Sequence, residues 1–402
     1  MGKLTYCLLI VVASAITGNT FAQNNTRLKP KKGVLRLINT EFRNAAAQYR
    51  YFKTQIPVDR LPKSLNKEGK LATSDASWWC SGFYPGTLFY LYENTGDTAL
   101  YAEASKRLIL LENEQYNKST HDLGFMMYCS FGQANRLKPD KRYEQILVNS
   151  AKSLSTRFDE RVGCIRSWDS KIPSEFLVII DNMMNLELLF YATKVTGDSS
   201  FYKIAVTHAN TTLKNHFRAD NSSYHVVDYN PLTRGINKKR THQGAADESA
   251  WARGQGWGLY GYTLMYRETG DKKYLDQANR IAAYVLNHPN LPADKIPYWD
   301  FNAPNIPGAL RDASAGALMA SAFIELAGYN NSKLAGTYLE TAGQIIKTLS
   351  SAQYKAEQGS NSGFLLKHSV GSIPHKSEVD SPQTYADYYY VEAMQRYKNL
   401  KK

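Results

Sequence analysis

The 402-residue sequence predicts an all-α fold in which helical hairpins close into a ring. Apolar, aromatic stretches alternate with amphipathic ones, and the alternating pattern of β-strands is scarce. The turn Thr-Gly-Asp recurs between these stretches, at residues 95–97, 196–198 and 269–271, with looser copies at 138–140 and 329–331. In each clear turn the Gly should end one helix and the Asp should cap the next. Five or six such hairpins fit the chain.

The first 22 residues have the pattern of a secretory signal peptide. Lys3 precedes the apolar run Leu8–Ala13, and small and polar residues then lead to Ala22, after which a signal peptidase would cleave. The run is too short to cross a membrane as a helix. We therefore expect an exported, periplasmic protein with a single domain at 23–402; a buried N-terminal helix is the alternative.

The two helices of each predicted hairpin differ in their apolar surface. The first is apolar nearly all round, as in 183–190, whereas the second has a polar face, which predicts an inner ring sheathed by an outer ring. An open solenoid would show the same hairpins, but Trp, Asp and His gather just before the inner helices, as expected if those helix starts meet at one mouth. The longest irregular stretches, 215–250 and 287–312, are expected to carry function.

The composition favours an anionic partner. Lys and Arg number 49 against 36 Asp and Glu, a net charge of +13, and 28 Tyr and 6 Trp offer flat surfaces for stacking on sugars or bases. The basic residues are scattered, which argues against nucleic acid for an exported chain. No phosphate-binding glycine loop, GxSxG or HExxH motif occurs, and His225 with Asp228 lacks a third ligand, so neither a metal nor a cofactor is expected.

Two aspartates stand at predicted starts of inner helices. Asp181 follows the apolar run Leu177–Ile180, so loss of solvation should raise its pKa and let it hold a proton near neutral pH. Asp122 opens another inner helix and could face the same cavity. Two carboxylates in one site push their pKa values apart, which gives one acid and one ionised partner. The alternative is that each Asp only caps its helix.

Arg253 lies between Trp251 and Trp257 on a further predicted helix. Arg253 and Trp257 are one turn apart, so the guanidinium and the indole should share a face. This pair suits a sugar that bears a carboxylate, because the indole stacks on the ring while the guanidinium binds the acid through two hydrogen bonds. The alternative is an Arg packed flat on a core Trp.

Ordered blocks of the sequence resemble the pattern of the unsaturated glucuronyl hydrolases, glycoside hydrolase family 88. The blocks are Trp79–Gly86, His121–Phe125, Ile179–Asn182, Ser249–Trp257, Asp312–Ala317 and Asp387–Ala393. Their order is kept over essentially the whole mature chain. The resemblance implies an (α/α)6 barrel, in agreement with the number of hairpins.

The resemblance also implies the activity and its residues. Family members act on the Δ4,5-unsaturated uronic acid that polysaccharide lyases leave at a non-reducing end, by hydrating its vinyl ether without a metal. By motif, Asp181 matches the general acid/base and Asp122 the second essential carboxylate. The implied substrate-binding residues are Trp79, His225, Thr241, Gln243, Arg253 and Trp257.

One segment departs from the family pattern. Members that act on mammalian glycosaminoglycans often carry a sulfate-binding stretch, Ser-x-x-Ser-x-Lys, shortly before the final block. Here Ser372 is kept, His375 stands at the second Ser, and the Lys is displaced by one position to Lys376. Sulfate could still bind through His375 and Lys376, with the preferred sulfation pattern left open.

The sequence thus predicts a hydrolase of unsaturated glucuronyl oligosaccharides from chondroitin, hyaluronan or heparin-type chains. One alternative is an unsaturated galacturonyl hydrolase of the related pectin-degrading family, against which the context of Asp122 argues. A sugar epimerase on the same barrel would be expected to show paired His acid/base residues, which are not found. A glycan-binding protein would bind the anionic oligosaccharide and leave its double bond intact.

Overall fold

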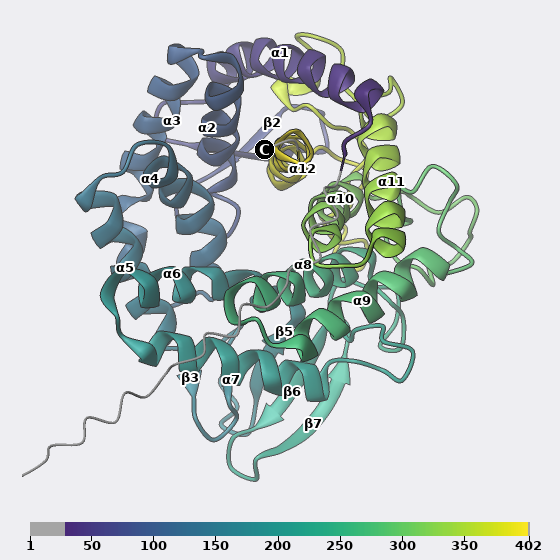
Figure 1. Cartoon of the computed structure of the whole chain (residues 1–402). Coiled ribbons are helices and arrows are strands. Elements are labelled where there is room, and N and C mark those ends of the chain that lie inside the picture. Colours follow the sequence, from purple (N-terminus) through teal and green to yellow (C-terminus); the bar gives the residue numbers. More distant parts are fainter. Residues whose placement is uncertain (1–28, 401–402) are drawn as a thin grey trace, which may run out of the picture.

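The computed structural model describes residues 29–400, which form a ring of paired helices (Figure 1). The outer helices are α1 (Lys32–Gln55), α3 (Thr98–Leu111), α5 (Lys141–Ser155), α7 (Ser199–Asn215), α9 (Lys272–Asn287) and α11 (Ser332–Leu349). The inner helices are α2 (Phe83–Thr95), α4 (Gln133–Leu137), α6 (Leu186–Thr196), α8 (Ala252–Thr269), α10 (Ala313–Ala327) and α12 (Thr384–Asn399). The π-helix η2 (Gly124–Gly132) runs into α4, and the 3-10 helix η3 (Ile180–Asn185) runs into α6.

The inner helices close on themselves. Each packs against the next around the ring, with η2 making the contact from α4 to α6, and α12 returns to pack against α2. As the sequence predicts, inner helices such as α10 are buried nearly all round, whereas outer helices such as α11 keep an exposed face. The predicted (α/α)6 barrel is confirmed, and the alternative prediction of an open solenoid is wrong.

The Thr-Gly-Asp turns join the helices as predicted. Gly96, Gly197 and Gly270 follow α2, α6 and α8 in the left-handed conformation, with φ of 72°, 74° and 69°. The next residues, Asp97, Asp198 and Asp271, accept backbone N–H groups of α3, α7 and α9 at 3.0, 2.8 and 3.1 Å. In the looser copies, Asp140 caps α5 and Asn331 caps α11.

Three small antiparallel sheets decorate the barrel. Strand β1 (Leu61–Leu65) pairs with β2 (Leu71–Ser74), and β3 (Phe158–Asp159) with β4 (Cys164–Ile165). The third sheet has the order β5 (Phe176–Ile179), β6 (Val226–Asn230), β7 (Gly235–Arg240). The prediction that 215–250 is irregular is therefore wrong in part, because β6 and β7 lie within it. After α9 ends at Asn287, the predicted irregular stretch carries no helix or strand until α10 begins.

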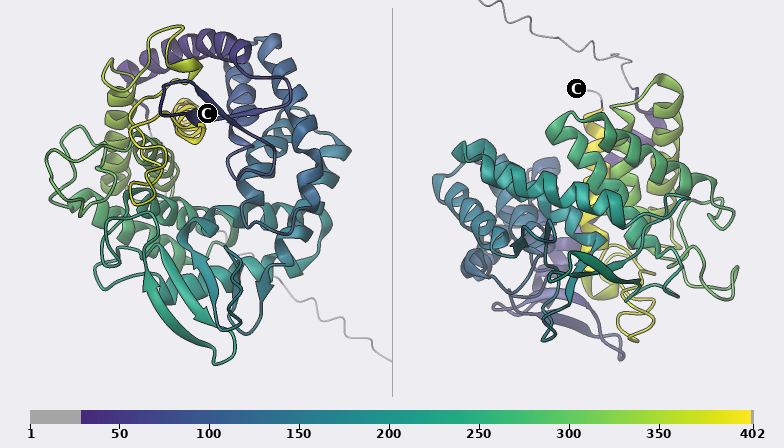
Figure 2. Two further views of the ribbon diagram at one scale, coloured as in Figure 1. Left: turned by 180° about the vertical axis from the view of Figure 1, so that it is seen from behind. Right: turned by 90° about the horizontal axis from the view of Figure 1, so that it is seen from below.

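Long connections gather at one end of the barrel. All three sheets and the long loops precede inner helices, so they lie where the inner helices begin, an end that we call the front mouth (Figure 2). At the opposite, rear end, the short Thr-Gly-Asp turns follow the inner helices. The front mouth therefore has the long loops that functional sites usually use.

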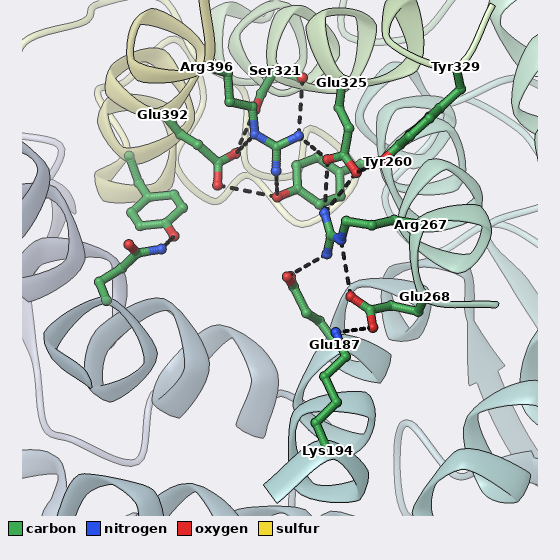
Figure 3. Close-up of polar contacts among 12 residues, drawn as sticks. Glu187, Lys194, Tyr260, Arg267, Glu268, Ser321, Glu325, Tyr329, Glu392 and Arg396 are labelled. Atoms are coloured by element: carbon green, nitrogen blue, oxygen red, sulfur yellow. Dashed lines mark hydrogen bonds and ion pairs between the residues drawn. The ribbon is translucent and has the colours of Figure 1, made fainter. Parts of the chain in front are cut away.

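An ionic network ties the inner helices together at the rear end (Figure 3). Arg267 of α8 pairs with Glu187 of α6 and, at 2.8 Å, with Glu325 of α10. Arg396 of α12 pairs with the same Glu325. Glu392 accepts hydrogen bonds from the hydroxyls of Ser321 (2.6 Å) and Tyr260 (3.2 Å). These contacts join four of the six inner helices.

The predicted signal peptide, residues 1–22, lies outside the described residues. Among residues 29–400, no helix combines the length and apolar character that a membrane-spanning helix requires.

Candidate active site

Asp181 lies at the front mouth, where β5 ends at Ile179 and η3 begins. Its side chain is 14% exposed, and its Oδ2 has no hydrogen-bond partner in the described chain. Burial raises the pKa of Asp181 to about 7, and the nearby charge of Asp122 raises it further, while Arg253 and the Trp257 indole oppose the rise. The predicted rise is confirmed. The capping alternative fails for Asp181, because its side chain accepts no helix N–H.

Asp122 shares this region with Asp181, since the charge of Asp122 raises the pKa of Asp181. Its Oδ2 accepts the Thr120 hydroxyl at 3.1 Å, and its Oδ1 lies 3.4 Å from His121 Nε2. The segment that follows Asp122 and the segment that contains Asp181 are joined by a hydrogen bond, in which the Phe125 N–H donates to Asn185 Oδ1 at 3.0 Å. The predicted convergence of the two carboxylates is therefore present in the structure.

His225 has one defined tautomer. Its Nδ1 accepts the backbone N–H groups of His242 and Gln243, both at 3.2 Å, so the ring hydrogen of the neutral form must be on Nε2. That Nε2 has no hydrogen-bond partner in the described chain and lies 3.6 Å from Asp181 Oδ2. Burial lowers the pKa of His225 well below its usual value, so the ring stays neutral and directs a donor toward the Asp181 carboxyl.

Arg253 and the Trp257 indole both lower the pKa of Asp181, so the two side chains approach the same carboxyl, but the guanidinium stacks on other rings. The Arg253 guanidinium lies 4.6 Å from the Trp251 ring and 5.2 Å from the Tyr385 ring. Trp251 precedes α8 and has a non-helical backbone, so helical periodicity does not reveal that its ring meets Arg253.

Arg253 also binds the chain itself. Its Nη1 donates to the Val370 carbonyl and lies 3.4 Å from Asp312, and its Nη2 donates to the Gly371 carbonyl at 3.0 Å. Its charge is retained, because neighbouring carboxylates and Tyr385 raise its pKa against the effect of burial. Both terminal nitrogens thus hold the loop at 370–371, and the predicted two-point contact with a substrate carboxylate is not preformed.

Trp257 and Trp79 belong to an aromatic floor beneath the carboxylates. Trp257 is fully buried against Phe125 (5.1 Å between ring centroids), and its indole N–H has no hydrogen-bond partner in the described chain. Half-buried Trp79 lies 5.6 Å from Phe125 and 5.0 Å from Tyr385. The Trp257 indole also acts on Asp181, whose pKa it lowers, while Trp79 keeps part of its ring exposed.

The remaining predicted residues lie on two loops that meet. Gln243 donates to the Gly371 carbonyl at 3.0 Å, while the Thr241 hydroxyl accepts the Gly244 N–H at 2.8 Å and so shapes its own turn. Ser372 and His375 share a hydrogen bond of 2.8 Å. Lys376 is exposed in the same turn, and its side chain makes no ion pair within residues 29–400.

Sequence reasoning missed several residues that line this mouth. Trp168 lies 4.8 Å from the His242 ring, His242 lies 4.1 Å from the His375 ring, and Tyr385 and Asp312 contact Arg253. His121 could have been found from the sequence, because it directly precedes Asp122. Trp168 gave no such signal, because it reaches the site only through its antiparallel bridge to Leu177 of β5 and its packing on Ile179 and Val226.

Metal ligands do not gather here. Within residues 29–400, no three side chains of His, Cys, Asp and Glu lie together as a metal ion would require. The chemistry available at the mouth is that of a protonatable carboxyl, a second carboxylate, a neutral imidazole donor and aromatic surfaces.

The model of Glycosyl Hydrolase Family 88 matches residues 57–399. The chain belongs to this family. An unsaturated glucuronyl hydrolase of Formosa agariphila is 43% identical over 406 residues, which cover 100% of this chain and 99% of that protein. A crystal structure of an unsaturated glucuronyl hydrolase specific for heparin is 47% identical, with a TM-score of 0.88 over 91% of this chain and 98% of that one.

A third family 88 relative has a bound ligand. It is a mutant unsaturated glucuronyl hydrolase of Streptococcus agalactiae, complexed with dGlcA-GalNAc6S. It is 28% identical, with a TM-score of 0.77 over 90% of this chain and 91% of that one.

Proposed function

We propose that this family 88 enzyme removes Δ4,5-unsaturated glucuronic acid from the non-reducing end of lyase-generated glycosaminoglycan oligosaccharides. The observation that carries the proposal is Asp181, whose carboxyl has a pKa of about 7 and lies beside Asp122 and His225 at the front mouth. A carboxyl with this pKa can both donate and accept a proton near neutral pH.

The reaction begins with the proton of Asp181. The proton bonds to C4, the π electrons of the C4=C5 bond form that bond, and positive charge spreads over C5 and the ring oxygen. A water molecule bonds to C5 and gives its proton to the Asp181 carboxylate, which restores the acid. The resulting hemiketal opens at its C5–O5 bond, and the hemiacetal left at C1 expels the rest of the sugar chain.

The neighbours of Asp181 stabilise both protonation states that this reaction needs. Asp122 disfavours a second negative charge and so keeps Asp181 protonated, while the Nε2–H of His225 stabilises the carboxylate once the proton has left. Arg253 contributes a fixed positive charge that attracts the uronic acid, although its terminal nitrogens also hold the loop at 370–371.

The proposal is tested with lyase-treated chondroitin, hyaluronan and heparin. The C4=C5 bond absorbs in the near ultraviolet, so hydrolysis is expected to remove this absorbance from at least one of these substrates. Asp181→Asn should abolish the loss, because an amide cannot supply the proton, and should leave the circular dichroism spectrum unchanged. Loss of absorbance only from lyase-cut rhamnogalacturonan would instead favour the galacturonyl alternative.

We further propose that the protein is exported and acts in the periplasm. The charged, apolar and small-residue segments that end at Ala22 support this location, as does the need to meet small oligosaccharides released outside the cytoplasm. Amino-terminal sequencing of the protein from periplasmic extracts should begin at Gln23. A start at Met1 in a cytoplasmic fraction would contradict the proposal.

A further inference from the structure

Arg240, the last residue of β7, is a half-buried cation beside the front mouth. Its guanidinium makes no hydrogen bond or ion pair with any residue of the described chain, residues 29–400. The neighbouring acid, Asp247, is occupied by Lys238 Nζ at 3.0 Å and by the Thr241 N–H at 3.0 Å. The charge of Arg240 acts on Asp247 and lowers its pKa, but the guanidinium donates no hydrogen bond within residues 29–400, which leaves its paired N–H groups for a ligand.

The register of the sheet fixes the face on which Arg240 lies. In the three neighbouring strands, Ile179 of β5 pairs with Val226 of β6, and Val226 pairs with Arg240 of β7. Residues paired across strands lie on the same face of the sheet, so all three side chains share one face. Ile179 and Val226 pack with Trp168, so Arg240 lies on the Trp168 face. The preceding residue, Lys239, points to the other face, where its Nζ lies 5.2 Å from the Tyr224 ring.

The Trp168 face continues toward the catalytic residues. The Trp168 ring lies 5.9 Å from His225, the neighbour of Asp181, and 4.8 Å from His242. Burial, His375 and the charge of Arg240 together lower the pKa of His242 to about 4, so this imidazole is neutral at physiological pH. An indole, a neutral imidazole and a permanent cation thus lie next to the catalytic residues.

We propose that Arg240 binds an anionic group on the part of the substrate beyond the bond that is broken. That group is a sulfate ester on the adjacent sugar or the carboxylate of the next uronic acid. A guanidinium presents paired donors that match the oxygens of either group. The proposal rests on the function proposed above and adds to it a residue that selects among substrates by the charge of their leaving group.

The test compares three unsaturated substrates by their loss of near-ultraviolet absorbance. They are an unsulfated disaccharide, the same disaccharide with a sulfate ester on its second sugar, and an unsulfated tetrasaccharide with a further uronic acid. Arg240→Gln should lower kcat/KM at least about tenfold for one of the two substrates with the additional anionic group, since a charged hydrogen bond is lost. It should change kcat/KM for the unsulfated disaccharide less than about twofold, because that substrate has no anionic group there.

Two further variants test whether the preference among the three substrates depends on the position and the guanidinium of Arg240. Lys239→Gln removes the adjacent charge from the opposite face and should leave the three values in their wild-type ratios. Arg240→Lys keeps a charge but loses the paired donors, so it should recover part of the preference.

The outcomes separate the two proposals. A loss confined to the sulfated disaccharide identifies the sulfate ester, and a loss confined to the tetrasaccharide identifies the carboxylate. An equal loss on all three substrates by Arg240→Gln, or no loss on any of them, overturns the role of Arg240. Wild-type enzyme that leaves all three spectra unchanged refutes the proposed function itself.

Discussion

At the scale of single residues, Asp181 is controlled by neighbours that act in opposite directions. Burial and the charge of Asp122 raise its pKa, whereas Arg253 and Trp257 lower it, and the balance lies at about 7. An aspartate with its ordinary pKa would be ionised at neutral pH and could not protonate a carbon. The burial of this side chain is therefore part of the chemistry of the site as well as of its packing.

Removal of the Asp122 charge should lower the pKa of Asp181. In Asp122→Asn the like charge that raises this pKa is gone, so the carboxyl should titrate at a lower pH than in the wild type. The measurement is the 13C NMR titration of the Asp181 carboxyl carbon, with Asp122→Glu as a control that keeps the charge. An Asp181 titration unmoved or raised in Asp122→Asn would show that the two carboxylates do not interact.

The same pKa predicts how stability depends on pH. The folded protein holds a proton on Asp181 up to about pH 7, whereas the unfolded chain releases it near 3.8, so Asp181 favours the folded state at low pH and this contribution is lost as pH rises from about 4 to about 7. Asp387, whose pKa is also about 7, has the same direction and pH range.

Asp181→Asn should remove the Asp181 contribution and leave that of Asp387. Relative to wild type, the variant should gain about 3 kcal/mol in free energy of unfolding between pH 5 and pH 8. Urea unfolding at the two pH values measures this difference, and no gain at pH 8 would contradict the raised pKa.

At the scale of elements, the turns between paired helices are specified locally. Gly197 has a φ of 74° and nothing within 4 Å of the position that a Cβ would take, so an Ala there has space but a strained backbone. Gly197→Ala should cost about 1 kcal/mol in free energy of unfolding. Gly336 also has open space but lies inside α11, so Gly336→Ala should stabilise by about 0.5–1 kcal/mol. Urea unfolding of both variants tests the pair, and changes of equal sign would show that φ is not the cause.

Such local turns explain why the helix pairs could be predicted from the sequence. A Gly that ends a helix and an Asp that caps the next one act within a few residues, so the pattern is visible along the chain. Asp181 could be predicted for a similar reason, because the apolar residues that bury it directly precede it. The strands β6 and β7 were missed because β6 is stabilised by pairing with β5, about 50 residues earlier.

The partners of Arg253 show where prediction from sequence fails. Helical periodicity places Trp257 on the same face, but the guanidinium turns toward Trp251 and toward carbonyl groups of the chain 117 and 118 residues later. Backbone carbonyls are common to every residue, so no residue type marks Val370 and Gly371 as its partners. The loop at the mouth is thus fixed by tertiary contacts that a single sequence does not reveal.

At the scale of the whole molecule, the two ends of the barrel have different tasks. At the front mouth, Asp181, His225 and Trp257 each keep a buried polar atom without a hydrogen-bond partner in the described chain. At the rear end, Arg267 and Arg396 are each paired with carboxylates from other inner helices (Figure 3). The front groups thus keep unused hydrogen-bonding capacity, while the paired groups at the rear hold the ring closed.

This division predicts that the rear network can be weakened without loss of catalysis. Arg267→Met leaves Glu187 without its cation, while Glu268 keeps Lys194 and Glu325 keeps Arg396, so the free energy of unfolding should fall by about 3 kcal/mol. Arg142→Met, which breaks the exposed pair with Glu112 on α5, should change it by less than about 0.5 kcal/mol. Urea unfolding measures both, and kcat at a temperature where the variants remain folded should stay within about twofold of wild type, a change of less than about 0.5 kcal/mol. A much larger loss of kcat in folded Arg267→Met would mean that the rear end also shapes the catalytic mouth, because the inner helices that carry the network begin at that mouth.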